Sequence, residues 1–241
     1  MNRKFAVFDF DGTLIRWQLY HAIVDNLAQN NLVDGESYEK VRLARHKWKI
    51  RESQDAFKDY ERELVNCYNL SLPSLPQTQL DQAINEVYQE HKQQVYVYTR
   101  DLVKELKEKG YFLIAISGSH REAVELVAKH YGFDDWVGTK YEIIDGKFTG
   151  KYQLPATEKD VVLNKLIEEH DLSLEDSYGV GDSEGDIPML ELVQNPIAFN
   201  PTEKLLAKAK EHGWKIVVER KNVVYELGKF DKNGENNYHL L

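Results

Sequence analysis

The sequence contains a single cysteine, Cys67, among its 241 residues. It therefore has no intrachain disulfide framework, and without a CxxC pair or a Cys/His cluster it offers no typical zinc site. This composition favours a reducing, intracellular setting, and we expect a cytoplasmic protein. Nothing beside Cys67 suggests a depressed thiol pKa, so we interpret it as an ordinary structural residue.

Long apolar runs and an excess of basic residues are also missing. The longest runs, Phe5–Phe8 and Tyr111–Ile116, are far below the ~18 residues of a membrane span, so we expect none. The basic residues at 1–4 are followed by only four apolar residues before Asp9, so we expect no export signal. With 31 Lys+Arg against 40 Asp+Glu, the net charge of -9 argues against general nucleic-acid binding.

Short apolar runs ending in polar turns alternate with helical patterns along much of the chain. This alternation predicts an α/β core, a Rossmann-like parallel sheet covered by helices on both faces. The predicted strands cover residues 4–8, 111–116, 178–182, 196–199 and 215–218, with a helix at 202–212. Asp145-Gly146 between two further short runs predicts a hairpin that adds an antiparallel piece to this core.

About 90 residues between the first two strands have a different pattern. They show long polar helices with aromatic and aliphatic stripes and no strand-like runs, which predicts an inserted helical cap. We therefore expect a core domain at 1–15 and 86–227 and a helical cap domain, which includes Cys67, at 16–85. Residues 228–241 are polar and turn-rich and are expected to form a frayed tail.

Carboxylates follow the first and third predicted strands. Asp9 and Asp11 lie two apart on an extended segment and point the same way, while Asp182 and Asp186 follow the third strand. Because ligands bind beyond the carboxyl ends of parallel strands, we expect these side chains to converge. Carboxylates that share a buried site need a cation, and a donor set of oxygens alone favours Mg2+.

Groups suited to an anionic substrate accompany these carboxylates. Ser117 and the amides of Gly118 and Ser119 precede a predicted helix, whose N-terminus favours a phosphate. Lys159 lies just inside a helix predicted to begin near Thr157 and offers a positive charge. A carboxylate nucleophile, Mg2+, a hydroxyl, amides and an ammonium together indicate phosphoryl transfer.

Each feature alone also has a simpler interpretation. Asp-x-Asp-Gly-Thr could be only a turn, Ser117 a loop residue, and Lys159 a solvated helix lysine. Asp186 could serve to cap a helix. What favours the catalytic interpretation is that all of them occur in order within one chain.

In this order they resemble the four motifs of the haloacid dehalogenase-like superfamily: Asp9-Phe10-Asp11-Gly12-Thr13, Ser117, Lys159, and Gly181-Asp182-Ser183-Glu184-Gly185-Asp186. The resemblance covers nearly the whole chain. The long helical insertion after the first motif is similar to that of the phosphoserine phosphatase-like branch, subfamily IB. So are three further segments: Glu142–Gly150, Asn195–Pro201 and Gly213-Trp214.

The resemblance implies a Mg2+-dependent phosphatase that acts through an aspartyl-phosphate on Asp9. It implies that Asp11 protonates the leaving alcohol and then deprotonates the water that resolves the intermediate. It places Mg2+ on the carboxylates of Asp9 and Asp182 and on the backbone carbonyl of Asp11. Asp186 would support this metal site indirectly or through water.

The same resemblance assigns the phosphoryl group to Ser117 and Lys159. Lys159 would also restrain Asp9, and Gly118 and Thr13 are weaker candidates. The superfamily's dehalogenases, phosphonate hydrolases and transport ATPases lack an Asp at the position of Asp11, so a phosphate ester is implied. The expected partner is a small phosphorylated metabolite.

Two alternative functions remain open at this point. A phosphotransferase that passes the phosphoryl group to a second alcohol would share the first half-reaction. A noncatalytic protein that binds phosphate ligands is the other alternative, disfavoured because all the expected catalytic groups are present.

Two departures from the phosphoserine phosphatase pattern bear on the substrate. That family has a Glu soon after the first motif that reads the substrate's amino group, whereas this chain has Arg16-Trp17-Gln18, which argues against phosphoserine. Gly185 replaces the usual Asn before the last Asp. The basic run Lys40–Arg51 could be a solvated helix face, or Arg45 or Arg51 could read an anionic group on the substrate.

Overall fold

The computed structural model describes residues 3–229 and 238–240, which form two compact units. The core unit draws its described residues from Met1–Gln18, His91–Thr139 and Leu154–Leu241. The helical unit comprises Leu19–Glu90 and Lys140–Gln153. The two boundaries near the helical insertion fall at 18/19 and 90/91, against predicted positions of 15/16 and 85/86.

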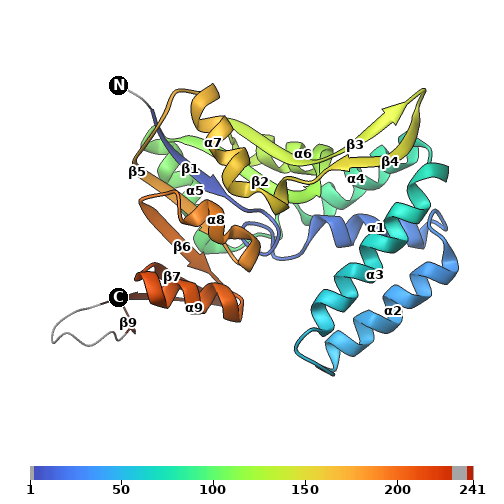
Figure 1. Ribbon diagram of the computed structural model, residues 1–241, viewed down its shortest axis with the longest axis horizontal. Helices are drawn as coiled ribbons and strands as arrows, with labels where there is room; N and C mark the ends of the chain where they lie inside the picture. The colour runs from blue at the N-terminus through green and yellow to red at the C-terminus, as the bar shows by residue number, and fades with distance from the viewer. Residues whose placement is uncertain (1–2, 230–237, 241) are drawn as a thin grey trace. The chain divides into compact units, whose positions relative to one another are not determined.

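The predicted α/β core is confirmed (Figure 1). Across the described residues of the core unit, its sheet has the strand order β3-β2-β1-β5-β6-β7-β8-β9. The first six in this order pair in parallel, and β8 and β9 add antiparallel strands at one edge. The strands are β1 (Arg3–Phe8), β2 (Phe112–His120), β3 (Asp135–Ile144), β5 (Leu172–Gly181), β6 (Asn195–Phe199), β7 (Lys215–Arg220), β8 (Val223–Lys229) and β9 (Tyr238–Leu240).

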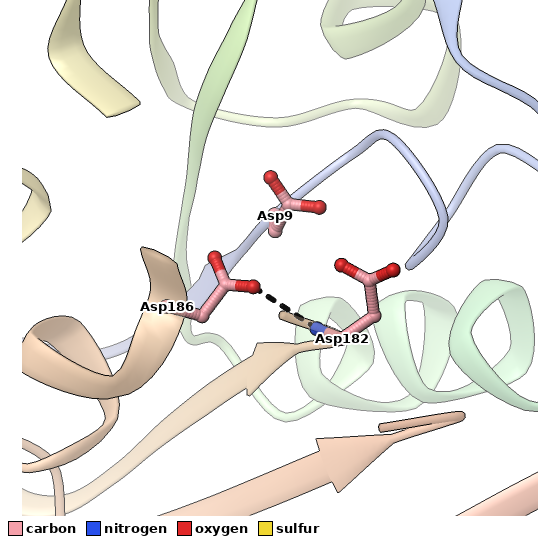
Figure 2. A group of neighbouring side chains, drawn as sticks. All are labelled: Asp9, Asp182 and Asp186. Atoms are coloured by element: carbon pink, nitrogen blue, oxygen red, sulfur yellow. Dashed lines mark hydrogen bonds between the residues drawn. The ribbon is translucent and has the colours of Figure 1, made fainter. Parts of the chain in front are cut away.

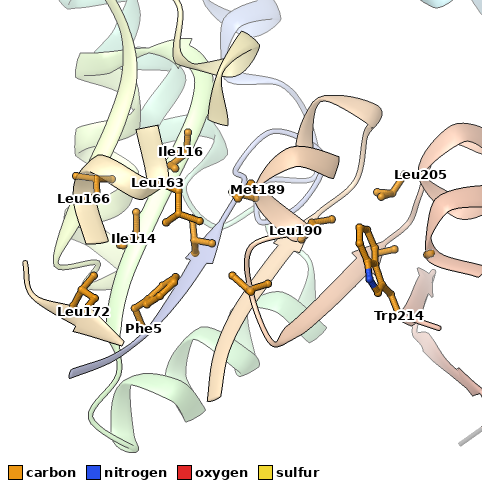
Figure 3. Close-up of a cluster of buried hydrophobic side chains, with 14 of the residues drawn as sticks. Phe5, Ile114, Ile116, Leu163, Leu166, Leu172, Met189, Leu190, Leu205 and Trp214 are labelled. Carbon is orange, nitrogen blue, oxygen red and sulfur yellow. The ribbon is translucent and has the colours of Figure 1, made fainter. Parts of the chain in front are cut away.

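The central strand β1 is buried on both faces, as its unbroken apolar run predicts. Phe5 and Val7 belong to a buried cluster with side chains from α7, α8 and α9. Figure 3 shows Phe5 among its neighbours in this cluster. Phe8 contacts Phe133, just after α6, in an edge-to-face pair. The helices of the core unit are α5 (Val97–Glu108), α6 (Arg121–Tyr131), α7 (Lys159–Glu169), α8 (Ile187–Leu190) and α9 (Glu203–His212), with 3-10 turns η2 (Pro155–Thr157) and η3 (Glu184–Asp186).

The helical unit contains α1 (Leu19–Gln29), α2 (Gly35–Lys49), α3 (Ala56–Ser71), η1 (Leu72–Ser74) and most of α4 (Gln77–His91). Apolar side chains at helical spacing form its interior, for example Tyr60, Leu64 and Cys67 on α3. Burial raises the pKa of the Cys67 thiol to about 11, which agrees with the structural role expected for this cysteine.

The hairpin around Asp145-Gly146 forms as predicted, with β4 (Lys147–Gln153) antiparallel to the second half of β3. Its assignment to the core was wrong, because residues 140–153 cluster with the helical unit. The reason is aromatic packing: the ring of Tyr141 contacts Tyr68 of α3 and also Phe148 of β4. The hairpin's apolar side chains therefore complete the interior of the helical unit.

The expected frayed tail is only partly within the described residues. Residues 230–237 and 241 lie outside them, whereas Gly228 and Lys229 end β8 and pair with His239 and Tyr238 of β9. The tail prediction was therefore wrong for these residues, because backbone pairing at a sheet edge requires no apolar run. None of the helices in the described part is long and apolar enough to cross a membrane.

Candidate active site

The candidate residues Asp9 and Asp182 leave the sheet from adjacent strands. The amide of Asp9 donates to the carbonyl of Val180 at 2.9 Å, which extends the pairing of β1 with β5 by one residue. Asp182 follows Gly181, the last residue of β5. β1 and β5 are where the strand order changes direction, and at such a point the loops separate and leave room for a ligand.

A buried lysine links two of the candidate carboxylates. Lys159 is the first residue of α7, so the helix begins two residues later than predicted, after the turn η2. Its Nζ donates to Oδ1 of Asp9 at 2.7 Å and to Oδ1 of Asp186 at 2.5 Å. The Lys159 side chain is only 4% exposed, and Asp186 is fully buried. One ammonium thus holds a carboxylate from β1 and one from the segment after β5.

The cluster carries more negative than positive charge, and this shifts its proton equilibria. Burial raises the pKa of Asp9 to about 7, and the charges of Asp186 and Asp11 add to this rise against the lowering effect of Lys159. Burial, Asp9 and Asp186 hold the pKa of Asp182 well above its usual range. Burial alone would lower the pKa of Lys159, but Asp186 and Asp9 raise it. Lys159 is therefore charged, and additional positive charge would favour ionisation of Asp9 and Asp182.

Asp186 has its carboxylate oxygens occupied by hydrogen bonds. Besides the contact of Oδ1 with Lys159, its Oδ2 accepts from the amides of Asp182 at 3.0 Å and Ser183 at 2.9 Å and from the Ser183 hydroxyl at 3.0 Å. Figure 2 shows the bond to the amide of Asp182. With Ser183, Asp186 also forms a capping box at η3. Asp186 therefore caps this turn and also belongs to the carboxylate cluster.

Ser183 is a site residue that the sequence reasoning missed. Its side chain and amide fix the orientation of Asp186 and thereby of Lys159. The signal was present in the Ser-x-x-Asp spacing of residues 183–186, which is a variant of the capping-box pattern.

Gly12 allows the loop after β1 to pass close to Asp182. Its φ is +85°, a conformation that favours glycine, and a Cβ at this position would lie 2.3 Å from Oδ2 of Asp182. The amide of Gly12 donates to the carbonyls of Ile15 and Trp17, so the loop closes back on itself. Next to it, Thr13 is buried, and its Oγ1 has no hydrogen-bond partner within the described chain.

The donor set fits a hard divalent cation. Asp9, Asp182 and Asp186 each offer an oxygen, and these oxygens lie within 4.8 Å of one another, as Figure 2 illustrates. Because Asp186 is already occupied by four donors, Asp9 and Asp182 are the carboxylates best able to hold a metal. Carboxylate oxygens without nitrogen or sulfur suit Mg2+ or Ca2+. A cation here would also relieve the repulsion that raises the pKa values of Asp9 and Asp182.

The side chain of Asp11 contacts the end of β2. Its Oδ2 accepts a hydrogen bond of 2.6 Å from the hydroxyl of Ser117, and this hydroxyl in turn accepts from the amide of Ser119 at 2.9 Å. Asp11 is not one of the three carboxylates whose oxygens lie within 4.8 Å of one another, although its charge contributes to the raised pKa of Asp9. Its carboxylate is fixed by the residue that was predicted to bind phosphate.

The segment after Ser117 leads into the N-terminus of α6, whose first turn carries the carboxylate of Glu122. α6 begins at Arg121, with no side-chain cap bond recorded at its N-terminus in the described structure. Gly118 lies close to η2, since a Cβ on it would be 3.1 Å from Cβ of Ala156. The carbonyl of Gly118 accepts from Thr139 Oγ1 at 2.6 Å, which ties this segment to β3.

The basic run Lys40–Arg51 lies on and just beyond α2 in the helical unit. The guanidinium of Arg45 donates to Asp25 and to the hydroxyl of Tyr60 at 2.8 Å, and its side chain is 19% exposed. It is therefore committed to partners inside the helical unit, contrary to the hypothesis that it reads a substrate anion. Arg51 is exposed, in a left-handed conformation just after α2.

Residues 6–191 match the family model described as haloacid dehalogenase-like hydrolase, and a second model with the same description matches residues 154–229. The chain is 28% identical to a histidinol-phosphatase of Neisseria meningitidis, over 89% of the chain and 98% of that protein. It is 27% identical to a phosphoserine phosphatase of Methanocaldococcus jannaschii, over 86% and 90% of the two chains.

Solved structures show the same fold. A Bordetella pertussis protein with unknown function aligns with a TM-score of 0.71 at 24% identity, covering 90% of this chain and 98% of that chain. A phospho-aspartyl intermediate analogue of phosphoserine phosphatase aligns with a TM-score of 0.63 at 24% identity, covering 92% and 95%.

Proposed function

The chain belongs to the haloacid dehalogenase-like hydrolase family, and we propose that it is a Mg2+-dependent phosphatase acting on a small phosphomonoester through Asp9. The resemblance to this superfamily and its phosphoserine phosphatase-like branch is confirmed, as is its class as a hydrolase. The observation that carries the proposal is the contact of Asp9 with Lys159, with Asp182 close by and Asp11 hydrogen-bonded to Ser117. The phosphatase names of the relatives support the same reaction.

Asp9 is the proposed nucleophile because its carboxylate is buried, oriented and only partly engaged. Lys159 holds Oδ1, so Oδ2 is available for attack on phosphorus. Attack forms a bond between Asp9 and phosphorus and breaks the bond to the leaving oxygen. Mg2+, when bound, supplies positive charge that keeps Asp9 and Asp182 ionised and offsets charge on the phosphoryl oxygens.

Asp11 is the proposed general acid and base. In the first step its proton passes to the leaving alcohol, and in the second it accepts a proton from the attacking water, whose oxygen displaces Asp9 from phosphorus. The hydrogen bond from Ser117 fixes the Asp11 carboxyl for this exchange. The proposed donors to the phosphoryl oxygens are Ser117, the amides before α6 and Lys159. Gly118, which has no side chain, lets this segment pack closely against Ala156.

The proposal is tested by phosphate release from a panel of phosphomonoesters with Mg2+ or with EDTA. We expect release that requires Mg2+ and that falls by at least about 1,000-fold in Asp9→Asn, since the nucleophile is lost. Asp81→Asn, which removes an exposed carboxylate on α4, is the matched control and should keep full activity. Folded protein that binds these esters but releases no phosphate would refute hydrolysis and favour a binding role.

A further inference from the structure

The backbone of Arg16 is held in place at the end of the loop that follows Asp9. The carbonyls on either side of it, those of Ile15 and Trp17, accept from the amide of Gly12 at 3.0 and 3.3 Å. The amide of Arg16 donates to the carbonyl of Gln94 at 2.9 Å. Its backbone is therefore held from two sides, within a few residues of Asp9 and Asp11.

The guanidinium of Arg16 lies at the same sheet edge as the carboxylate cluster. It lies over the ring of Tyr96, with 5.6 Å from its central carbon to the ring centroid. Tyr96 in turn packs edge-on against Phe199, the last residue of β6, at 4.9 Å between centroids. β6 is the neighbour of β5, which ends just before Asp182.

The charges of Asp182 and Arg16 both act on the phenol of Tyr96. Burial and the negative charge of Asp182 raise the pKa of its phenol, whereas the positive charge of Arg16 lowers it. Asp182 and Arg16 are therefore both close enough to the Tyr96 phenol for their charges to act on it.

Arg16 is exposed, and the structure records no carboxylate partner for it in the described part of the chain. Two other arginines of the core unit do have one, since Arg3 pairs with Asp134 and Arg100 pairs with Asp101. Lys159 already faces the nucleophile from within the buried cluster, so the phosphoryl group has its own cation. Arg16 is a second cation at the same end of the strands, and it faces solvent. It is therefore suited to bind an anionic group other than the phosphoryl group.

We propose that Arg16 reads a second anionic group on the leaving alcohol, so that the substrate is a phosphomonoester that also bears a carboxylate or another phosphate. This assignment rests on the proposed phosphatase function. Guanidinium groups form charge-assisted, bidentate hydrogen bonds with both kinds of anion. The same charge disfavours alcohols that carry an ammonium in place of the anion.

The test compares four phosphomonoesters: 3-phosphoglycerate, fructose 1,6-bisphosphate, p-nitrophenyl phosphate and phosphocholine. For the first two, Arg16→Ala should raise KM by about tenfold to a hundredfold with little change in kcat, because a charge-assisted hydrogen bond is lost from binding. For p-nitrophenyl phosphate and phosphocholine, KM should stay within about twofold or fall. Arg16→Lys should restore part of the affinity for the two anionic esters.

Arg3→Ala is the matched control. Its guanidinium also lies over an aromatic ring, 5.2 Å from the centroid of Phe112, but it stands at the start of β1, the opposite end of that strand. Arg3→Ala should leave all four KM values unchanged. Equal losses on all four esters in Arg16→Ala would show a merely structural role and overturn the assignment, as would an unchanged KM for both anionic esters.

Direct binding separates this assignment from the phosphatase proposal. In an Asp9→Asn background, titration calorimetry with 3-phosphoglycerate should show binding that Arg16→Ala weakens by about tenfold or more. Such a result would support the role of Arg16 even if the wild-type protein released no phosphate. Equal affinity of the two proteins for 3-phosphoglycerate would refute it.

Discussion

Replacing Asp9, the proposed nucleophile, with asparagine should stabilise the metal-free protein and abolish the proposed turnover. Asp9 is buried among Asp11, Asp182 and Asp186 with a single ammonium beside it, and its pKa rises from 3.8 to about 7. Asp9→Asn removes the charge that burial disfavours, and its amide oxygen can still accept the hydrogen bond from Lys159. The charged cluster is thus expected to cost stability whenever no cation is bound.

The sign and size of this effect follow from the pKa rise. A carboxyl whose pKa is higher in the folded state binds more protons folded than unfolded, so it lowers stability as pH rises from about 4 to about 7. The full rise is worth about 4 kcal/mol. Between pH 5 and pH 8, about 2 to 3 kcal/mol of this penalty develops in the wild-type protein and is absent from Asp9→Asn.

Urea unfolding in EDTA at pH 5 and pH 8 measures the difference directly. Asp9→Asn should be more stable than wild type at pH 8, with a smaller gain at pH 5, and Mg2+ should narrow the gap by stabilising the wild type. Asp81→Asn, on the exposed side of α4, should show no such pH-dependent gain. A variant that is less stable than wild type at pH 8, or a gap independent of pH, would refute the electrostatic reasoning.

Three further substitutions test other parts of the structure. Gly12→Ala should lower the free energy of unfolding by about 1 to 3 kcal/mol more than Gly110→Ala, since both have positive φ but only the first clashes with Asp182; equal losses in urea unfolding would contradict this. Asp186→Ala should cost about 3 to 5 kcal/mol in the same assay because four donors, among them the buried amides of Asp182 and Ser183, lose their acceptor; a loss below about 1 kcal/mol would show that the cluster relaxes. His21→Phe should gain stability over wild type as pH falls from about 6.5 to about 3, because burial and then Arg45 lower the pKa of His21 to about 3. Parallel pH profiles of the two proteins in thermal unfolding would count against that mechanism.

The parts of the fold that were predictable are those whose burial shows in the local sequence. β1 and β2 are apolar runs with both faces covered, and their order along the chain indicates a parallel sheet. The place of the hairpin was not predictable, because the partner of Tyr141 is Tyr68, on a helix remote in sequence. β8 was missed because its exposed Val223, Val224 and Tyr225 lie in a segment that also contains charged residues.

The candidate site likewise has a part that the sequence predicted and a part that it did not. That Asp9 and Asp182 approach each other follows from the ends of two strands, since parallel strands carry their carboxyl ends to one edge. The four hydrogen bonds to Asp186 depend on side-chain torsions, which no sequence pattern specifies. The pairing of Arg45 with Asp25 was likewise hidden, because it joins two helices whose packing register the sequence leaves open.

The excess of negative charge in the cluster points to a function rather than to stability. If burial of polar groups served stability alone, the ammonium of Lys159 would need one carboxylate, yet Asp9 and Asp186 both contact it and Asp182 lies within reach of both. An excess of buried negative charge is unfavourable by itself, and it becomes favourable once a divalent cation is present. The sequence keeps Gly12 next to Asp182, where any side chain would force the carboxylate to move. The excess of buried carboxylates in the core unit, unfavourable for stability by itself, therefore supports the proposed Mg2+ site.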